Sequence, residues 1–316
     1  MIFLENLIFC LNATVPIFLL MVLGFFLRRI GFMEKSFADK INSFVFKAAL
    51  PALLFQDMAG SDLFSHWDGS FVLFCLLATA FSILLLVLLS RFFQPEIRGE
   101  MVQASYRSSV ALLGVAFIEN IYGTAGAAPM MIVGAVPLYN IAAVLVLTLM
   151  RPGRGTLDIA LLKKTLREVI TNPILLGILA GFLWSTLKIP QPYIFQRTLS
   201  LFSAIATPLG LIGLGATVEI EEARAELAPA LLCAAFKLVI FVSLLIPIAV
   251  WMGYHTDKLV TLLILLGSAT TSASYVMARN LGYGGALTAN TVMLTTCLSA
   301  FTLTGWLYLL RSLGLV

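Results

Sequence analysis

The chain has 316 residues, of which 60% are hydrophobic and only 11% charged, and its mean hydropathy is +1.00. Soluble domains carry about 25% charged residues, so this composition excludes a soluble protein: lipid must cover much of the apolar surface. The net charge of +4 does not indicate a nucleic-acid partner, because the basic residues lie between hydrophobic segments.

Hydrophobic segments separated by charged or Gly/Pro-rich gaps predict ten membrane spans. Several segments exceed the roughly 18 apolar residues that mark a spanning helix. Helices are expected because lipid-exposed backbone has to satisfy its own hydrogen bonds, and no segment has the alternating polarity of a membrane barrel. The predicted spans are about 7–27, 38–57, 69–90, 101–122, 128–150, 169–188, 198–217, 228–252, 258–280 and 287–310.

The first predicted span is repeated near the middle of the chain. The stretch PIFLLMVLGFF at 16–26 resembles PILLGILAGFL at 173–183, and a shift of 157 residues places Gly24 on Gly181. The same shift matches ALPALLF to ATPLGLI further along each half. Prolines and glycines kept in register favour an internal duplication over a chance likeness between apolar segments.

The duplication predicts two five-helix repeats, 1–157 and 158–316, with opposite orientations in the membrane. An odd number of spans per half inverts the second copy, and inverted repeats are typical of secondary transporters. With the N-terminus outside, fourteen of the 20 Lys and Arg residues, Arg107 among them, fall in inward gaps and four in outward gaps. The positive-inside rule therefore predicts that both termini lie outside.

The fourth and ninth spans are unusually polar and hold the candidate substrate site. They read YRSSVALLGVAFIENIYGTAG and LLGSATTSASYVMARNLGYGG, at equivalent places in the two halves. Ser, Thr and Gly permit a helix to unwind, and the resulting half-helix termini can hold a charged solute. Small residues that only let helices pack closely are the alternative. The candidate solute contacts are Ser108, Ser109, Asn120, Asn140, Thr271, Ser272, Ser274 and Tyr275.

Lys47 and Lys237 both fall within predicted spans, and Lys237 lies about a third of the way along the eighth. A lysine in the membrane interior usually faces a cavity or a partner, which would make it a counter-charge for an anion. It could instead extend to the inner surface and keep its charge in water. Both interpretations stay open.

Catalytic and nucleotide-binding motifs are missing from the sequence. There is no HExxH, GxSxG or Walker sequence, and the four cysteines lack metal-ligand spacing. Neither an enzyme nor a cofactor or metal site is expected, and ATP-driven transport by this chain is not indicated.

These segments resemble the auxin efflux carrier family, the bacterial relatives of plant PIN-type auxin transporters, over essentially the whole chain. VPIFLLMVLGFFLRRIGFM resembles the first helix of that family, TNPILLGILAGFLWSTLKIPQP the sixth and ATPLGLIGLGATV the seventh. YRSSVALLGVAFIENIYG and SASYVMARNLGYGG resemble the fourth and ninth.

The resemblance implies an all-α fold of ten helices in two inverted repeats, like that of sodium–proton antiporters and bile-acid symporters. It implies a scaffold domain, about 7–57 and 169–217, that is often dimeric. The transport domain would comprise about 69–150 and 228–310, with the fourth and ninth helices broken where they cross. The implied substrates are small organic anions such as auxin, malate or malonate.

The sequence departs from the family at the implied crossover, which comprises Gly114, Ala116, Gly267 and Ala269. The family has Asn and then Gly–x–Pro in the fourth helix. Here Ser109 stands at the Asn position and Ala116 replaces the proline, and Ala269 falls near the proline position of the ninth helix. A sensor that kept the carrier fold but lost movement is therefore an alternative, as is a bile-acid-type sodium symporter. The coupling ion, proton or sodium if any, is left open.

Overall fold

The computed structural model describes residues 2–60, 67–151, 159–217 and 226–316, and this part of the chain is helical with no strand. The only extended pairing in it is an isolated bridge between Ser108 and Thr270. The helices are α1 (Ile2–Arg29), α2 (Lys35–Phe44), α3 (Leu50–Gly60), α5 (Gly69–Leu89), α6 (Arg98–Tyr106), α7 (Val115–Tyr122), α8 (Ala128–Leu149), α9 (Ile159–Ile170), α10 (Pro173–Thr186), α11 (Tyr193–Ser203), α12 (Ala206–Ala216), α13 (Leu227–Ala235), α14 (Phe241–Trp251), α15 (Thr256–Gly267), α16 (Ala273–Asn280) and α17 (Ala286–Ser312).

Short irregular turns join several of these helices into longer rods. The turns η1 (Val45–Ala49), η3 (Val110–Gly114) and η4 (Phe236–Ile240) are π-helical, and η2 (Ser90–Phe92) is a 3₁₀ turn. Single π turns inside α-helices are often found at functional sites, and η3 directly follows the bridge at Ser108.

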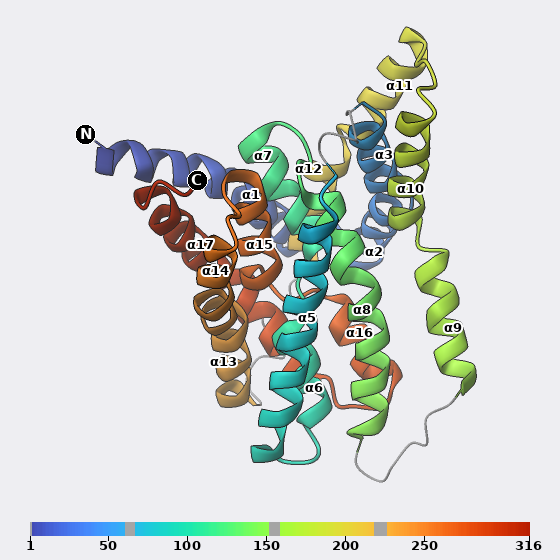
Figure 1. Cartoon of the computed structure of the whole chain (residues 1–316). Helices are drawn as coiled ribbons and strands as arrows, with labels where there is room; N and C mark the ends of the chain where they lie inside the picture. Colours follow the sequence, from blue (N-terminus) through green and yellow to red (C-terminus); the bar gives the residue numbers. More distant parts are fainter. Residues whose placement is uncertain (1, 61–66, 152–158, 218–225) are drawn as a thin grey trace.

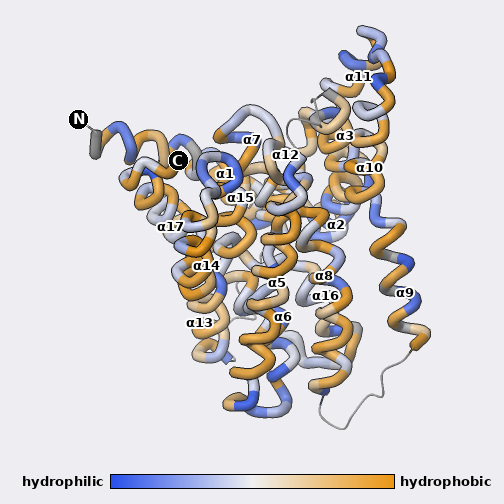
Figure 2. The backbone as a smooth tube through the Cα atoms, in the orientation of Figure 1, coloured by the Kyte–Doolittle hydropathy of each residue, from blue (hydrophilic) through white to orange (hydrophobic). Residues whose placement is uncertain are grey.

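Six helical stretches in the described residues are long and apolar enough to cross a membrane. They are Leu4–Arg29, Gly69–Phe92, Ala128–Leu149, Tyr193–Ala216, Leu227–Trp251 and Ala286–Ser312. Val110–Tyr122 and Pro173–Thr186 are shorter apolar helices. Apolar residues cover the outer faces of these helices (Figure 2), and Ile194 is 80% exposed. A surface of this kind is expected where lipid replaces water, so the chain is a multi-pass membrane protein.

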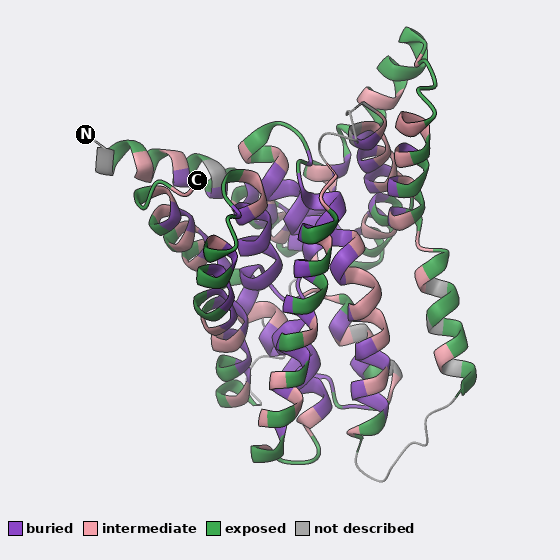
Figure 3. Cartoon of the chain, in the orientation of Figure 1, coloured by how far each residue is buried: buried purple, intermediate pink, exposed green. Residues whose placement is uncertain are grey.

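The helices form two flanks around a buried centre (Figure 1). On one flank lie α3, α10 and α11, and on the other lie α13, α14 and α17. Buried side chains concentrate between the flanks, along α6, α7 and α15 (Figure 3). In α15 every residue from Leu259 to Gly267 is buried.

Glycines allow two helix pairs to pack with their backbones in contact. A Cβ atom on Gly24 of α1 would overlap the carbonyl oxygen of Ile212 in α12. A Cβ atom on Gly181 of α10 would lie 2.7 Å from the carbonyl oxygen of Phe55 in α3. Small residues at such interfaces let membrane helices approach closely, so α1 is fixed on α12 and α10 on α3.

An ion pair and an N-cap fix the start of α5. Asp68 accepts hydrogen bonds from the backbone nitrogens of Ser70 (2.9 Å) and Phe71 (3.2 Å), and Lys258 at the start of α15 lies 2.7 Å away. The hydrogen bond from Lys258, followed by that from the Ser70 side chain, lowers the pKa of Asp68 to about 2. The carboxylate thus joins the ends of α5 and α15.

Asp68→Asn is expected to lower the stability of the protein at neutral pH by up to about 1 kcal/mol, because asparagine still caps the helix but loses the ion pair with Lys258. Because the pKa of Asp68 is lowered on folding, its contribution is complete above the ordinary aspartate pKa. It is lost as the pH falls from about 4 toward about 2. Thermal unfolding should therefore separate the variant from the parent chain at pH 7, and the gap should narrow toward pH 2. A gap independent of pH would contradict this role.

Candidate functional site

Two helices are interrupted where they meet in the buried centre. The first break, residues 107–109, separates α6 from η3 and α7, and the second, residues 268–272, separates α15 from α16. Both are rich in Ser and Thr, whose side chains compete with the backbone for hydrogen bonds and so disfavour helix interiors. The sequence of each break therefore favours an interruption at these places.

The two breaks pair with each other in an antiparallel arrangement. The backbone nitrogen of Ser109 donates to the carbonyl oxygen of Ala269 at 2.9 Å, and that of Thr271 donates to the carbonyl oxygen of Arg107 at 3.2 Å. A buried backbone group without a partner is costly. Each break therefore supplies hydrogen-bond partners that the other lost where its helix ended. We call the paired residues 107–109 and 268–272 the crossing.

Side chains of the crossing also cap the opposite helices. Ser108 donates through Oγ to the carbonyl oxygen of Leu265, in the last turn of α15. Thr270 donates through Oγ1 to the carbonyl oxygen of Ala104, in the last turn of α6, at 2.7 Å. The last carbonyls of a helix have no partner within the helix. The two hydroxyls are thus used reciprocally, one on each helix end.

Lys237 caps the end of α15 from the neighbouring turn η4. Its side chain is only 1% exposed, and Nζ donates to the carbonyl oxygens of Leu266 (2.7 Å) and Leu265 (3.3 Å). A cation is stabilised at the C-terminal end of a helix dipole. Of the two sequence interpretations, the structure excludes extension of Lys237 to the surface and places its amino group at the end of α15, beside the crossing.

Arg107, the first residue of the first break, is a buried cation that the sequence analysis assigned to an inward gap. Its residue is 7% exposed. The guanidinium donates to Asn140 Oδ1 on α8 and to Met277 Sδ on α16, both at 2.6 Å. Both acceptors are neutral, and a guanidinium has five N–H groups. In the described part of the chain no carboxylate neutralises this charge.

The nearest acidic residue along α6 is already committed elsewhere. Glu100 is buried, and its carboxylate accepts hydrogen bonds from the backbone nitrogens of Gly285 (2.9 Å) and Thr288 (3.1 Å) and from Thr288 Oγ1 (2.8 Å). These groups belong to the N-terminal end of α17, where a negative charge is favoured. Glu100 therefore holds α6 against α17 instead of pairing with Arg107.

Most of the predicted solute contacts lie at or next to the crossing. Ser109 is 7% exposed, and Asn140 is held by Arg107. Thr271, Ser272 and Tyr275 are partly buried. Ser274 is fully buried, and its Oγ has no hydrogen-bond partner among the described residues.

Asn120 is the predicted contact that the structure does not bring to the crossing. It is exposed near the C-terminal end of α7, and its Nδ2 donates to the carbonyl oxygen of Asn12 in α1 at 3.0 Å. Next to it, Glu119 accepts a hydrogen bond from Thr207 Oγ1 in α12. This end of α7 contacts the α1–α12 pair instead.

The helix breaks do not coincide with all four residues of the implied crossover. Ala269 lies in the second break and Gly267 ends α15, but Gly114 and Ala116 lie in η3 and α7, beyond the first break. A Cβ atom on Gly114 would lie 3.2 Å from the side chains of Ile264 and Met131. Gly114 thus provides close packing after the interruption and does not form it.

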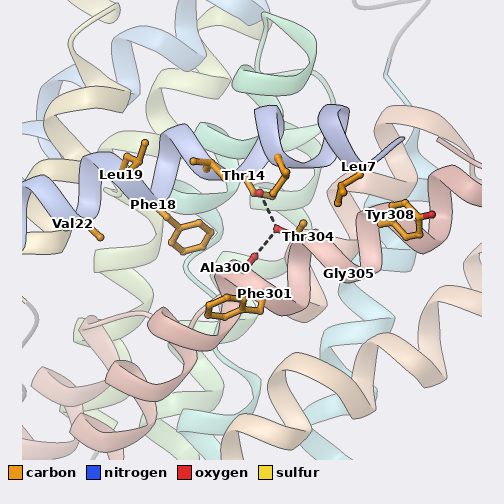
Figure 4. A pocket seen from close by; sticks show the side chains of 12 residues that line it. Leu7, Thr14, Phe18, Leu19, Val22, Ala300, Phe301, Thr304, Gly305 and Tyr308 are labelled. Atoms are coloured by element: carbon orange, nitrogen blue, oxygen red, sulfur yellow. Dashed lines mark hydrogen bonds between the residues drawn. The ribbon is translucent and has the colours of Figure 1, made fainter. Parts of the chain in front are cut away.

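A separate groove between α1 and α17 is unsuited to an anion. It encloses about 500 Å³ and is lined by aliphatic and aromatic side chains from both helices, as Figure 4 shows. Its hydroxyls are already used: Thr14 and Thr304 lie 2.8 Å apart, and Thr304 donates to the carbonyl oxygen of Ala300 at 2.6 Å. The crossing, with its cations and hydroxyls, is the better candidate for a polar solute.

Comparison with known proteins identifies the family. A family model described as "Membrane transport protein" matches residues 9–307. A protein of Rhizobium meliloti (strain 1021), named "Putative malonate transporter", is 24% identical over 315 residues, which cover 95% of this chain and 96% of that protein. A membrane transporter and not an enzyme is therefore indicated. The chain belongs to the membrane transport protein family, which is the auxin efflux carrier family that the sequence resembles.

Proposed function

We propose that this protein is a secondary carrier that moves a small organic anion across the membrane by alternating access. The observation that carries the proposal is Arg107: a buried guanidinium at the crossing of two interrupted helices, with only neutral acceptors. A charge kept in a membrane interior at this cost usually serves function. An anionic solute would supply the missing negative charge.

The proposed binding groups lie at the two breaks and in the first turn of α16. Ser109, Thr271 and Ser272 offer hydroxyls and backbone groups at the breaks, and Ser274 and Tyr275 offer hydroxyls directly after the second. Asn140 would keep its hydrogen bond with Arg107, or that bond would break so that the guanidinium can bind the solute. Since the Ser108 hydroxyl caps α15, it supports the site without contacting the solute, and Asn120 lies outside it.

A dicarboxylate is the substrate class that we favour. Arg107 lies in the crossing and Lys237 caps the helix end beside it, both buried, and a dicarboxylate could pair one carboxylate with each of them. The relative from Rhizobium meliloti carries malonate in its name. Monocarboxylates of the auxin type would neutralise Arg107 alone.

We further propose the ten-span architecture with two inverted repeats, 1–157 and 158–316. The glycine contacts support it: adding 157 to Gly24 and to Phe55 gives Gly181 and Ile212. The contact of Gly24 with Ile212 and that of Gly181 with Phe55 are therefore the same contact in the two halves. A duplicated chain whose first helix packs on the second helix of the other half would produce this pair.

In this architecture α1, α2, α3, α10, α11 and α12 form the scaffold, and the helices of 69–150 and 228–310 carry the crossing. The scaffold would supply a homodimer contact, and both termini would lie outside a bacterial cytoplasmic membrane. Proton or sodium coupling stays open, and imposing each gradient separately on vesicles loaded with substrate would distinguish the two.

Exchange in proteoliposomes tests the carrier function. Vesicles preloaded with unlabelled malonate are expected to accumulate more labelled malonate than empty vesicles. Each unlabelled malonate that the carrier moves out exposes the site to the outside, where it can bind a labelled one. Uptake of labelled indole-3-acetate or taurocholate, with and without sodium, tests the other anion classes. A protein that binds malonate without exchanging it would be a receptor and would refute the proposal.

A further inference from the structure

Helix α9 lies at the edge of the molecule and shares little surface with it. It follows residues 152–158 and precedes the Asn172 N-cap of α10, and its main contacts in the described part of the chain are with α8 and, less extensively, with α10. Figures 1 and 3 show it outside the bundle with most of its described side chains exposed. It is not among the helices that are apolar enough to cross a membrane.

An apolar stripe on α9 is left uncovered. Ile159, Leu166 and Ile170 fall on one face of the helix at 3.6 residues per turn, and they are 69%, 42% and 72% exposed. Leu162 and Val169, on the adjoining strip, are partly buried. One edge of the apolar face is thus sheltered and the other is open.

Basic side chains run beside the open edge. Lys163 and Arg167 are one turn apart and both exposed. They lie on the strip of the helix surface directly beside the apolar stripe. Lys164 adds a third positive charge on the far side of these two. An apolar stripe flanked by Lys and Arg is the pattern of a helix that lies in a membrane interface.

We propose that α9 binds anionic phospholipid headgroups, with Ile159, Leu166 and Ile170 inserted among the acyl chains and Lys163 and Arg167 on the phosphates. The bilayer is the fitting occupant because of position. The helix stands between α8, a spanning helix, and α10, an apolar helix that begins three residues after it. A surface next to two such helices meets lipid before it meets a soluble partner. This inference depends on the membrane location alone, so it stands or falls separately from anion transport.

A fluorescent reporter on the apolar stripe tests the proposal in the full-length protein. Cys10, Cys75 and Cys233 are buried and Cys297 is exposed, so Cys297→Ser gives a background for labelling. An environment-sensitive dye on Leu166→Cys is compared with the same dye on Ala160→Cys, on another face. Vesicles consist of phosphatidylcholine alone or with phosphatidylglycerol, and nitroxide lipids serve as quenchers. We expect strong quenching of the Leu166 label in anionic vesicles and weak quenching of the Ala160 label.

Charge removal supplies the decisive comparison. At about 1 kcal/mol per basic residue near an anionic surface, K163Q/R167Q should weaken the α9–lipid equilibrium roughly 30-fold. The matched variant K188Q/R197Q removes one Lys and one Arg elsewhere and should leave the quenching unchanged. Added salt should act like K163Q/R167Q, because it screens exposed charges.

Three results would overturn the proposal. In the first, the Leu166 label remains in water in both kinds of vesicle. In the second, its quenching is the same with neutral lipids as with anionic lipids, and the same in K163Q/R167Q as in the parent chain. Alternatively, the label could self-quench as the protein density in the vesicles rises, regardless of lipid, which would assign the stripe to a second copy of the chain.

Discussion

Arg107→Gln is expected to abolish most anion transport without destabilising the protein. The guanidinium is buried at the crossing and contacts only neutral acceptors. Removing one member of a buried, hydrogen-bonded charge pair costs about 2–5 kcal/mol. The apparent affinity for the anion should therefore fall roughly 30-fold to several thousand-fold. Uptake of labelled malonate by proteoliposomes measures this loss.

The thermal stability of the Arg107→Gln protein should rise or stay unchanged, although its transport falls. A buried charge without a counter-charge is costly to the folded state, so the substrate-free Arg107→Gln protein should unfold at the same or a higher temperature than the parent chain. Arg107→Lys keeps the charge but loses the planar fork and should retain partial uptake. Arg197→Gln, at an exposed position of α11, is the matched control. Full transport by Arg107→Gln would remove the anion site from the crossing.

Gly24→Ala is expected to destabilise the protein by at least about 3 kcal/mol, the upper part of the range for overpacked cores. The added methyl group would overlap a backbone carbonyl, that of Ile212, and a backbone atom cannot turn aside as a side chain can. Either α1 or α12 would have to move. Thermal unfolding and the yield of monodisperse protein after purification measure the effect.

Two other glycines supply matched variants for this experiment. Gly181→Ala should also destabilise, but less, because its nearest atoms are the Phe55 carbonyl and the Met58 side chain at 2.7 Å. Gly305→Ala on α17 meets no atom within 4 Å and should be neutral or slightly stabilising, since alanine favours a helix by up to about 1 kcal/mol over glycine. Equal stability of the Gly24 and Gly305 variants would refute the close α1–α12 contact.

The sequence predicted the helical membrane class and the polar character of the crossing well, because both depend on local composition. Hydrophobic length identifies long spans such as α5 and α8 without knowledge of their neighbours. The Ser and Thr residues of 107–109 and 268–272 likewise weaken a helix wherever it is placed. The family resemblance implied breaks in the fourth and ninth helices, and the structure has helix breaks at 107–109 and 268–272.

The exact place of the first break could not be predicted, because pairing across the fold decides it. Ser109 ends up opposite Ala269, whereas Gly114, which looked like the helix-breaking position, contacts Ile264 and Met131. Local propensity contains no information on which residue of one segment will face which residue of another.

Arg107 was missed although the sequence carried a signal. An arginine inside the predicted span 101–122, directly before two serines, is unusual enough to mark a buried charge. Counting it as a surface charge for orientation hid that signal. For Lys237 the sequence left two interpretations, because only the end of α15 at Leu265 and Leu266 explains its burial.

In a carrier that alternates as proposed, the buried guanidinium would also make the empty crossing sensitive to membrane voltage. Arginine stays protonated in proteins, so an unloaded carrier would transfer a positive charge through part of the electric field each time its crossing changed sides. One elementary charge moved across the whole bilayer is worth about 2.3 kcal/mol per 100 mV. An inside-negative potential would therefore draw the vacant crossing toward the cytoplasm and hold it there until an anion arrives.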